Sequence, residues 1–176
     1  LLAVGYVPLA EFERARTLAA EAIAMGCKAL LVPSACPARH SPSHVGLFPL
    51  WAQAEEAGLP IVFHVGGGGR LLDPMYFENG LPPVADFHGG AENFRSVDFM
   101  AIPHPPMQTL ATLIIDGILE RFPRLMIGVI EQGAVWVPGW MRMMDTACEA
   151  FRKHEERLRN LELRPSEYVR RQIRVT

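Results

Sequence analysis

The chain has 176 residues, of which 49% are hydrophobic and 20% are charged. A chain with this many hydrophobic residues can bury a core, so the composition excludes an intrinsically disordered protein. Lys and Arg number 17 against 19 Asp and Glu, and the formal charge of -2 creates no net positive field for nucleic acid or an anionic membrane. We therefore expect a single domain over residues 1–176 whose partner is a small-molecule substrate.

The cysteines are few and irregularly spaced. Cys27, Cys36 and Cys148 are an odd set without Cys-x-x-Cys spacing, which favours a reducing compartment over a disulfide framework or a structural zinc site. The apolar opening, residues 1–7, is too short to cross a bilayer and lacks the features of a signal peptide. We expect a cytoplasmic protein. Because the sequence does not begin with Met, we also expect residues upstream of Leu1.

Apolar runs alternate with segments of helical spacing along the chain. Short apolar runs predict strands at residues 1–7, 28–32, 61–65, 125–130 and 173–176. Apolar residues three and four positions apart predict helices at residues 9–23, 47–57, 107–121, 136–158 and 165–170. Pro8 suits the first turn of the first helix, and Gly26 suits the left-handed position that follows it.

A long segment without a clear period separates the third strand from the next helix. Residues 66–105 hold the run Gly66–Gly69 and several prolines, and loops of this length are commonly functional. The glycine run lacks the Lys and Ser or Thr of a phosphate-binding loop, which favours a flexible substrate loop. His88 and His104 lie in the same segment and are candidates for substrate contact, although an ordinary surface position explains each equally simply.

Repeated strand–helix units predict a parallel sheet covered by helices. An open doubly wound sheet and a (β/α)₈ TIM barrel both satisfy this pattern. No Gly-x-Gly-x-x-Gly follows the first strand, whereas polar residues end several strands, at Ser34, His64 and Glu131. A barrel builds its active site from such strand ends, so the barrel is the favoured fold class.

His64 and Glu131 are the residues best placed for chemistry. An imidazole at a strand end can bind a metal ion, and the competing interpretation is a core histidine bonded to a carbonyl. Glu131 ends the next strand, where a carboxylate can serve as metal ligand, general base or partner of a histidine. Taken alone, Glu131 is better explained by an ion pair with a loop arginine or by hydrogen bonds that its carboxylate accepts from the following turn.

Several segments together resemble the amidohydrolase-related family, the branch of the amidohydrolase superfamily that contains aminocarboxymuconate-semialdehyde decarboxylase. They are Gly58-Leu-Pro-Ile-Val-Phe-His64-Val-Gly66, Glu120-Arg-Phe-Pro-Arg-Leu-Met-Ile-Gly-Val-Ile-Glu131-Gln-Gly133, Trp136-Val-Pro138 and Met141-Arg-Met-Met-Asp145. The resemblance extends over nearly the whole chain. It implies a (β/α)₈ barrel of which this sequence holds strands three to seven.

The resemblance also implies one divalent metal ion, with Zn²⁺ expected first and Mn²⁺ or Fe²⁺ as alternatives. In the family the ion is bound by a His-x-His pair on strand one, a histidine on strand five and an aspartate on strand eight. His64 matches the strand-five histidine. The sequence has no His-x-His and no aspartate after an eighth strand, so it holds one such ligand, fewer than the usual three.

Glu131 departs from the family pattern, because decarboxylases and hydratases of the family usually carry a histidine at the end of strand six. The ordinary pKa of glutamate is about two units below that of histidine, which makes hydrolysis as strong an expectation as decarboxylation. We expect Glu131 to act as the catalytic proton-transfer group and His104 and Trp136 to shape the substrate pocket. The alternative is a noncatalytic partial barrel that serves binding or assembly. The family also suggests a homodimer.

Overall fold

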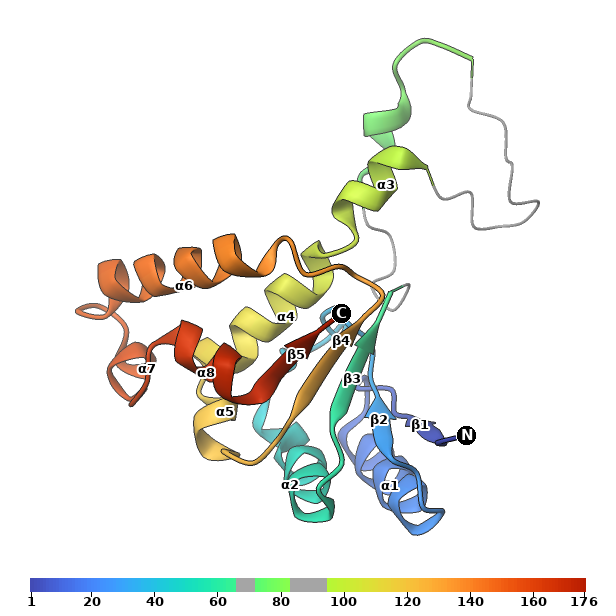
Figure 1. Cartoon of the computed structure of the whole chain (residues 1–176), viewed down its shortest axis with the longest axis vertical. Coiled ribbons are helices and arrows are strands. Elements are labelled where there is room, and N and C mark those ends of the chain that lie inside the picture. The colour runs from blue at the N-terminus through green and yellow to red at the C-terminus, as the bar shows by residue number, and fades with distance from the viewer. Residues whose placement is uncertain (66–71, 83–94) are drawn as a thin grey trace.

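The computed structural model describes residues 1–65, 72–82 and 95–176. Its five strands are β1 (Val4–Tyr6), β2 (Ala29–Leu31), β3 (Ile61–His64), β4 (Ile127–Ile130) and β5 (Ile173–Val175). They form one sheet in sequence order, and every neighbouring pair is parallel (Figure 1). Each predicted strand is thus confirmed, with slightly narrower bounds. The parallel order requires a crossover between successive strands, which the intervening helices supply.

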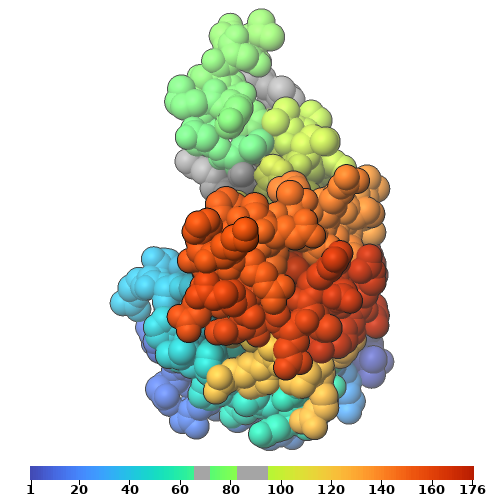
Figure 2. Space-filling view, turned by 90° about the vertical axis from the view of Figure 1, so that its left-hand side faces the viewer, coloured from blue at the N-terminus to red at the C-terminus, as the bar shows by residue number. Residues whose placement is uncertain are grey.

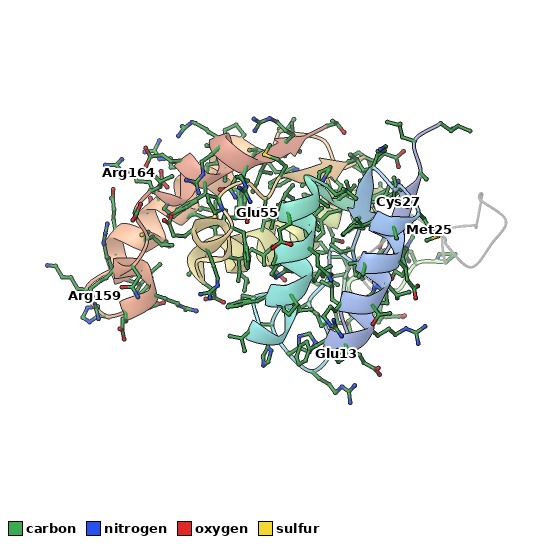
Figure 3. All side chains as sticks on the ribbon, turned by 90° about the horizontal axis from the view of Figure 1, so that it is seen from below. Glu13, Met25, Cys27, Glu55, Arg159 and Arg164 are labelled. Carbon is green, nitrogen blue, oxygen red and sulfur yellow. The ribbon has the colours of Figure 1, made fainter. Side chains whose placement is uncertain are left out.

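The helices follow the strands in the expected alternation. They are α1 (Phe12–Ala24), α2 (Phe48–Ala57), α3 (Ser96–Ala101), α4 (His104–Ile115), α5 (Ile118–Arg121), α6 (Val137–Phe151), α7 (Glu156–Arg159) and α8 (Pro165–Gln172), with 3₁₀ turns η1 (Val45–Leu47) and η2 (Pro74–Phe77). Helices α1 and α2 lie side by side (Figure 3). Glu55 of α2 accepts the backbone N–H of Arg124 at 2.8 Å, which ties this layer to the segment before β4.

Side chains of the central strands alternate between a covered and an open face. Ile61 and Phe63 of β3 are fully buried in the core beneath the helices, whereas Val62 and His64 are only partly buried. Strand β4 shows the same alternation. In a barrel the outer face of the sheet packs against helices and the inner face carries the remaining side chains. His64 therefore belongs to the face that would line a barrel interior.

The close packing of α1 on β1 depends on small side chains. Ala15, Ala19 and Ala22 of α1 are buried. A Cβ atom at Gly5 of β1 would lie 2.4 Å from the Cβ of Ala22, a distance at which one of the two elements would have to move. The absence of a side chain at Gly5 thus lets the helix approach the strand, and it secures the first strand–helix unit of the sheet.

Several helix boundaries differ from the sequence prediction. Helix α1 begins at Phe12 rather than at Leu9, so Pro8 precedes the helix instead of occupying its first turn. Gly117 has a φ of 79° and divides the predicted helix 107–121 into α4 and α5, because left-handed backbone interrupts helical bonding. The predicted helix 136–158 is α6 followed by α7. Gly26, with a φ of 80°, lies where it was predicted.

A side chain caps the carboxyl end of α6, which the spacing of apolar residues in the sequence did not predict. The guanidinium of Arg159, labelled in Figure 3, donates to the carbonyl oxygens of Arg152 at 3.5 Å and Lys153 at 3.2 Å. Carbonyls at a helix end lack partners within the helix, so these bonds stabilise termination there.

Tyr168 provides a pH-dependent contribution to stability. Its side chain is fully buried on α8, its hydroxyl donates to the carboxylate of Glu120, and it accepts the N–H of Leu163 at 3.2 Å. Burial, assisted by the bond to Glu120, raises the pKa of Tyr168 to about 12. The tyrosine of the unfolded chain ionises near pH 10, so this contribution is complete below about pH 10 and is lost as the pH rises toward 12.

We expect the free energy of unfolding to fall by about 2 kcal/mol from this group between about pH 10 and pH 12. Urea denaturation at several alkaline pH values measures the change, and Tyr168→Phe is the control because it removes the ionisable group and keeps the ring. If the variant loses stability over this pH range as steeply as the parent protein, Tyr168 is not responsible.

Candidate active site

The structure brings His64 and Glu131 together at the carboxyl end of the sheet. His64 is the last residue of β3 and pairs in register with Ile130 of β4, so Glu131 follows directly beyond the neighbouring strand. His64 Nε2 lies 3.3 Å from Glu131 Oε2. Within this chain the side chains are 42% and 68% exposed, respectively. Two residues far apart in the sequence thus form one polar centre.

The backbone of Glu131 has an unfavourable conformation. Its φ of 58° is the only positive value at a non-glycine residue within the described ranges. A side chain with a Cβ costs roughly 1–2 kcal/mol in the left-handed region, and glycine would avoid this cost. Strain of this kind is concentrated at functional sites, where the required position of a side chain outweighs the preference of the backbone.

A hydrogen bond of Nδ1 fixes the orientation of the His64 ring. Nδ1 lies 2.6 Å from the carbonyl oxygen of Val65. A carbonyl oxygen can only accept, so Nδ1 is assigned as the N–H donor of this bond. Metal-binding histidines commonly have this arrangement, in which a backbone carbonyl holds one nitrogen and the other faces the ion. The imidazole is therefore prepared for coordination through Nε2.

The donor chemistry of the pair fits a divalent ion. Imidazole nitrogen and carboxylate oxygen both bind zinc and manganese. No group of three or more His, Cys, Asp or Glu side chains suited to a metal ion occurs within residues 1–65, 72–82 and 95–176. His64 and Glu131 could thus provide two ligands of a site that requires at least one more.

His104 and Trp136 are not joined to the pair. His104 is exposed and begins α4, so it is part of a helix rather than of the loop predicted over residues 66–105. The indole N–H of Trp136 donates to the carbonyl of Gly133 at 2.7 Å, and its ring contacts Trp140 edge-on at 5.3 Å. Among the described residues, no hydrogen bond or ion pair connects either side chain to His64 or Glu131. Their pocket roles remain predictions.

The part of the predicted long loop that is described contains its own short elements. Figures 1 and 2 show η2 and α3 in a projection that extends beyond the body of the molecule. Arg95 holds the two pieces together, because its guanidinium lies 3.1 Å from the ring centroid of Phe77 and its Nε lies 3.2 Å from a carboxylate oxygen of Asp98. The glycine run 66–69 and His88 lie outside the described residues.

Two further polar residues lie at strand ends. Gln132, which the sequence interpretation passed over, is only 8% exposed, and its amide atoms have no hydrogen-bond partner within the described part of the chain. The sequence feature that could have identified Gln132 is its position directly after Glu131. Ser34 is buried, and its carbonyl oxygen accepts from the hydroxyl of Thr109 at 2.6 Å, which joins the end of β2 to α4. In this structure Ser34 therefore helps to hold the end of β2 against α4.

In the described parts of the chain, no helix is long and apolar enough to cross a membrane.

Comparison with known families and structures gives consistent results. The model of the amidohydrolase family matches residues 2–173. An amidohydrolase from Mycobacterium avium subsp. paratuberculosis superposes with a TM-score of 0.71 and 24% identity, covering 97% of this chain and 41% of that one. No match was found among the curated proteins.

Two decarboxylases have similar folds. The 5-carboxyvanillate decarboxylase of Novosphingobium aromaticivorans, with bound manganese, has a TM-score of 0.68 and 21% identity over 99% of this chain and 46% of its own. The 2,6-dihydroxybenzoate decarboxylase of Rhizobium has a TM-score of 0.69 and 18% identity over 99% of this chain and 51% of its own.

The chain therefore spans about half of these structures or less, and its sheet is an incomplete (β/α)₈ barrel. The parallel strand order and the position of His64 on the inner face of the sheet are consistent with such a barrel. The family match over residues 2–173 is consistent with it too. This chain belongs to the amidohydrolase family.

Proposed function

We propose that the protein is a metal-dependent enzyme that acts on a small organic substrate bearing a carboxylate, by hydrolysis or by nonoxidative decarboxylation. The observation that carries the proposal is the contact of 3.3 Å between His64 Nε2 and Glu131 Oε2 at the carboxyl end of a barrel sheet, where enzymes of this fold have their active sites. The decarboxylases with similar folds support a carboxylate-bearing substrate.

His64 would hold the ion through Nε2, because the carbonyl of Val65 fixes the ring through Nδ1. When bound, a divalent ion would supply Lewis-acid polarisation of an oxygen. The manganese in the Novosphingobium enzyme favours Mn²⁺ at least as much as the Zn²⁺ expected from the sequence. Glu131 is the proton-transfer group, because its carboxylate lies 3.3 Å from His64 Nε2 and can accept or return a proton.

The substrate pocket and the setting of the enzyme are parts of the same proposal. We assign His104 and Trp136 to the pocket wall, His104 through its exposed ring at the start of α4 and Trp136 through its ring face, since its N–H is already bonded. A reducing compartment such as the cytoplasm suits the three free thiols of Cys27, Cys36 and Cys148. A homodimer remains an expectation from the family.

Metal analysis of the full-length protein tests the proposal. After dialysis against metal-free buffer, plasma mass spectrometry is expected to find close to one equivalent of manganese, zinc or iron per chain. The metal-loaded protein is then incubated with 5-carboxyvanillate and 2,6-dihydroxybenzoate, with release of CO₂ as the readout for decarboxylation, and with ester and amide substrates for hydrolysis. Negligible metal content would contradict the proposal and favour a noncatalytic binding or assembly module.

A further inference from the structure

We infer that Glu131 is itself a ligand of the divalent ion held by His64, through the carboxylate oxygen that faces the imidazole. The inference rests on the proposed function, because it names a second ligand of the proposed metal. It differs from the pattern implied by the resemblance, which takes ligands from strands one, five and eight and gives the residue after strand six a proton-transfer role. Three observations support coordination by Glu131.

The first observation is the chemistry of the two neighbouring atoms. Nδ1 of His64 lies 2.6 Å from the Val65 carbonyl oxygen and is assigned as the donor of that bond, which leaves Nε2 as the nitrogen available to a ligand. Nε2 lies 3.3 Å from a carboxylate oxygen of Glu131. Imidazole nitrogen and carboxylate oxygen both bind divalent metals. The two side chains thus offer one ion two ligand atoms.

The second observation is the distance, which separates a shared metal ion from a shared proton. Charge-assisted N–H···O bonds are about 2.7–2.9 Å long. Two ligand atoms that each lie about 2.1 Å from one ion, at angles of about 90–110°, are about 3.0–3.4 Å apart. The separation of 3.3 Å between Nε2 and Oε2 lies in the second range and outside the first. The spacing thus suits two ligands of one ion.

The third observation is the backbone of Glu131. Its φ of 58° has a cost that glycine would avoid. In this conformation the side chain contacts His64. A carboxylate has two oxygens, so Oε2 can bind the ion while Oε1 remains available to move a proton. Coordination and proton transfer by Glu131 are therefore compatible.

Metal affinity of Glu131 variants tests the inference without relying on activity. Competition with a chromophoric chelator measures the affinity of the full-length protein for Mn²⁺ and Zn²⁺, and the visible absorption of bound Co²⁺ reports the ligand set. Changes at residues that only support a ligand weaken binding about 10–100-fold. We expect Glu131→Gln to weaken binding more than about 100-fold and to alter the Co²⁺ spectrum.

Two controls separate coordination from simple charge attraction. Glu131→Asp keeps the charge but shortens the side chain by one methylene, so a ligand role predicts a loss close to that of Glu131→Gln, whereas long-range attraction predicts nearly full affinity. Glu56→Gln removes an exposed carboxylate from α2 and is expected to leave affinity unchanged. Circular dichroism of each metal-free variant verifies that the fold is retained.

The outcomes distinguish the inference from the proposed function. If the parent protein binds one ion and Glu131→Gln binds it with similar affinity and an unchanged Co²⁺ spectrum, Glu131 is not a ligand, but the metal-dependent function stands. The same conclusion follows if Glu131→Asp retains full affinity and the parent spectrum. If the parent protein itself binds no divalent ion, the proposed function fails and the inference fails with it.

Discussion

Replacement of His64 by alanine is expected to lower the metal content of the full-length protein from about one equivalent to near zero. The substitution removes the imidazole whose ring is held in place by the 2.6 Å bond from Nδ1 to the Val65 carbonyl. Loss of a direct ligand should exceed the 10–100-fold loss of affinity typical of supporting residues, so we expect at least about a hundredfold decrease. Plasma mass spectrometry after dialysis measures the content.

The matched control is His154→Ala, which removes an exposed histidine beyond the end of α6. Its metal content should equal that of the parent protein. Because His64 is partly exposed, its replacement should leave the fold intact, and circular dichroism verifies this point. Full metal occupancy in His64→Ala would refute the assignment of His64 as a ligand.

Replacement of Glu131 by glycine should stabilise the protein and inactivate it. Glycine tolerates the φ of 58° at this position, so we expect the free energy of unfolding to rise by about 1 kcal/mol. Removal of the carboxylate should lower kcat/KM by at least about a hundredfold, the lower end of the contribution of a general acid or base. Chemical denaturation of the metal-free protein measures the first effect, and steady-state kinetics with whichever of the substrates tested above is turned over measure the second.

Glu131→Ala separates these effects. Alanine lacks the carboxylate but retains Cβ, so it should lose activity as glycine does without the gain in stability. A Glu131→Gly variant that is less stable than Glu131→Ala would show that the backbone of residue 131 is not strained. Unchanged kcat/KM in both variants would show that the carboxylate has no role in the reaction.

Local patterns in the sequence sufficed to locate the strands. The five apolar runs became the five strands because a strand buried against helices needs little beyond short stretches of Ile, Val, Leu and Phe. The helix boundaries were less predictable. The apolar period continued through Gly117, where left-handed backbone ends α4, and the end of α6 depends on Arg159, which reaches back from the next helix.

The candidate site was predictable in its members but not in its geometry. His64 and Glu131 were recognisable because each directly follows apolar residues of a strand. The contact between the two side chains depends on the pairing of β3 with β4. From the sequence alone, an ion pair elsewhere was the better explanation of Glu131. His104 was placed wrongly in the loop predicted over residues 66–105. Pro105 and Pro106 follow it, and prolines in the first turn of a helix are compatible with a helix that starts at His104.

The sequence by itself determined the strand–helix alternation, the parallel sheet and the polar residues at strand ends, because periodicity and turn residues act over a few neighbouring positions. Only the tertiary structure decided which nitrogen of His64 is free, how far it lies from Glu131 and that Glu131 has left-handed backbone. These properties arise where two strands meet. They depend on the backbone carbonyl of Val65 and on the φ angle of Glu131, and the identity of a side chain specifies neither.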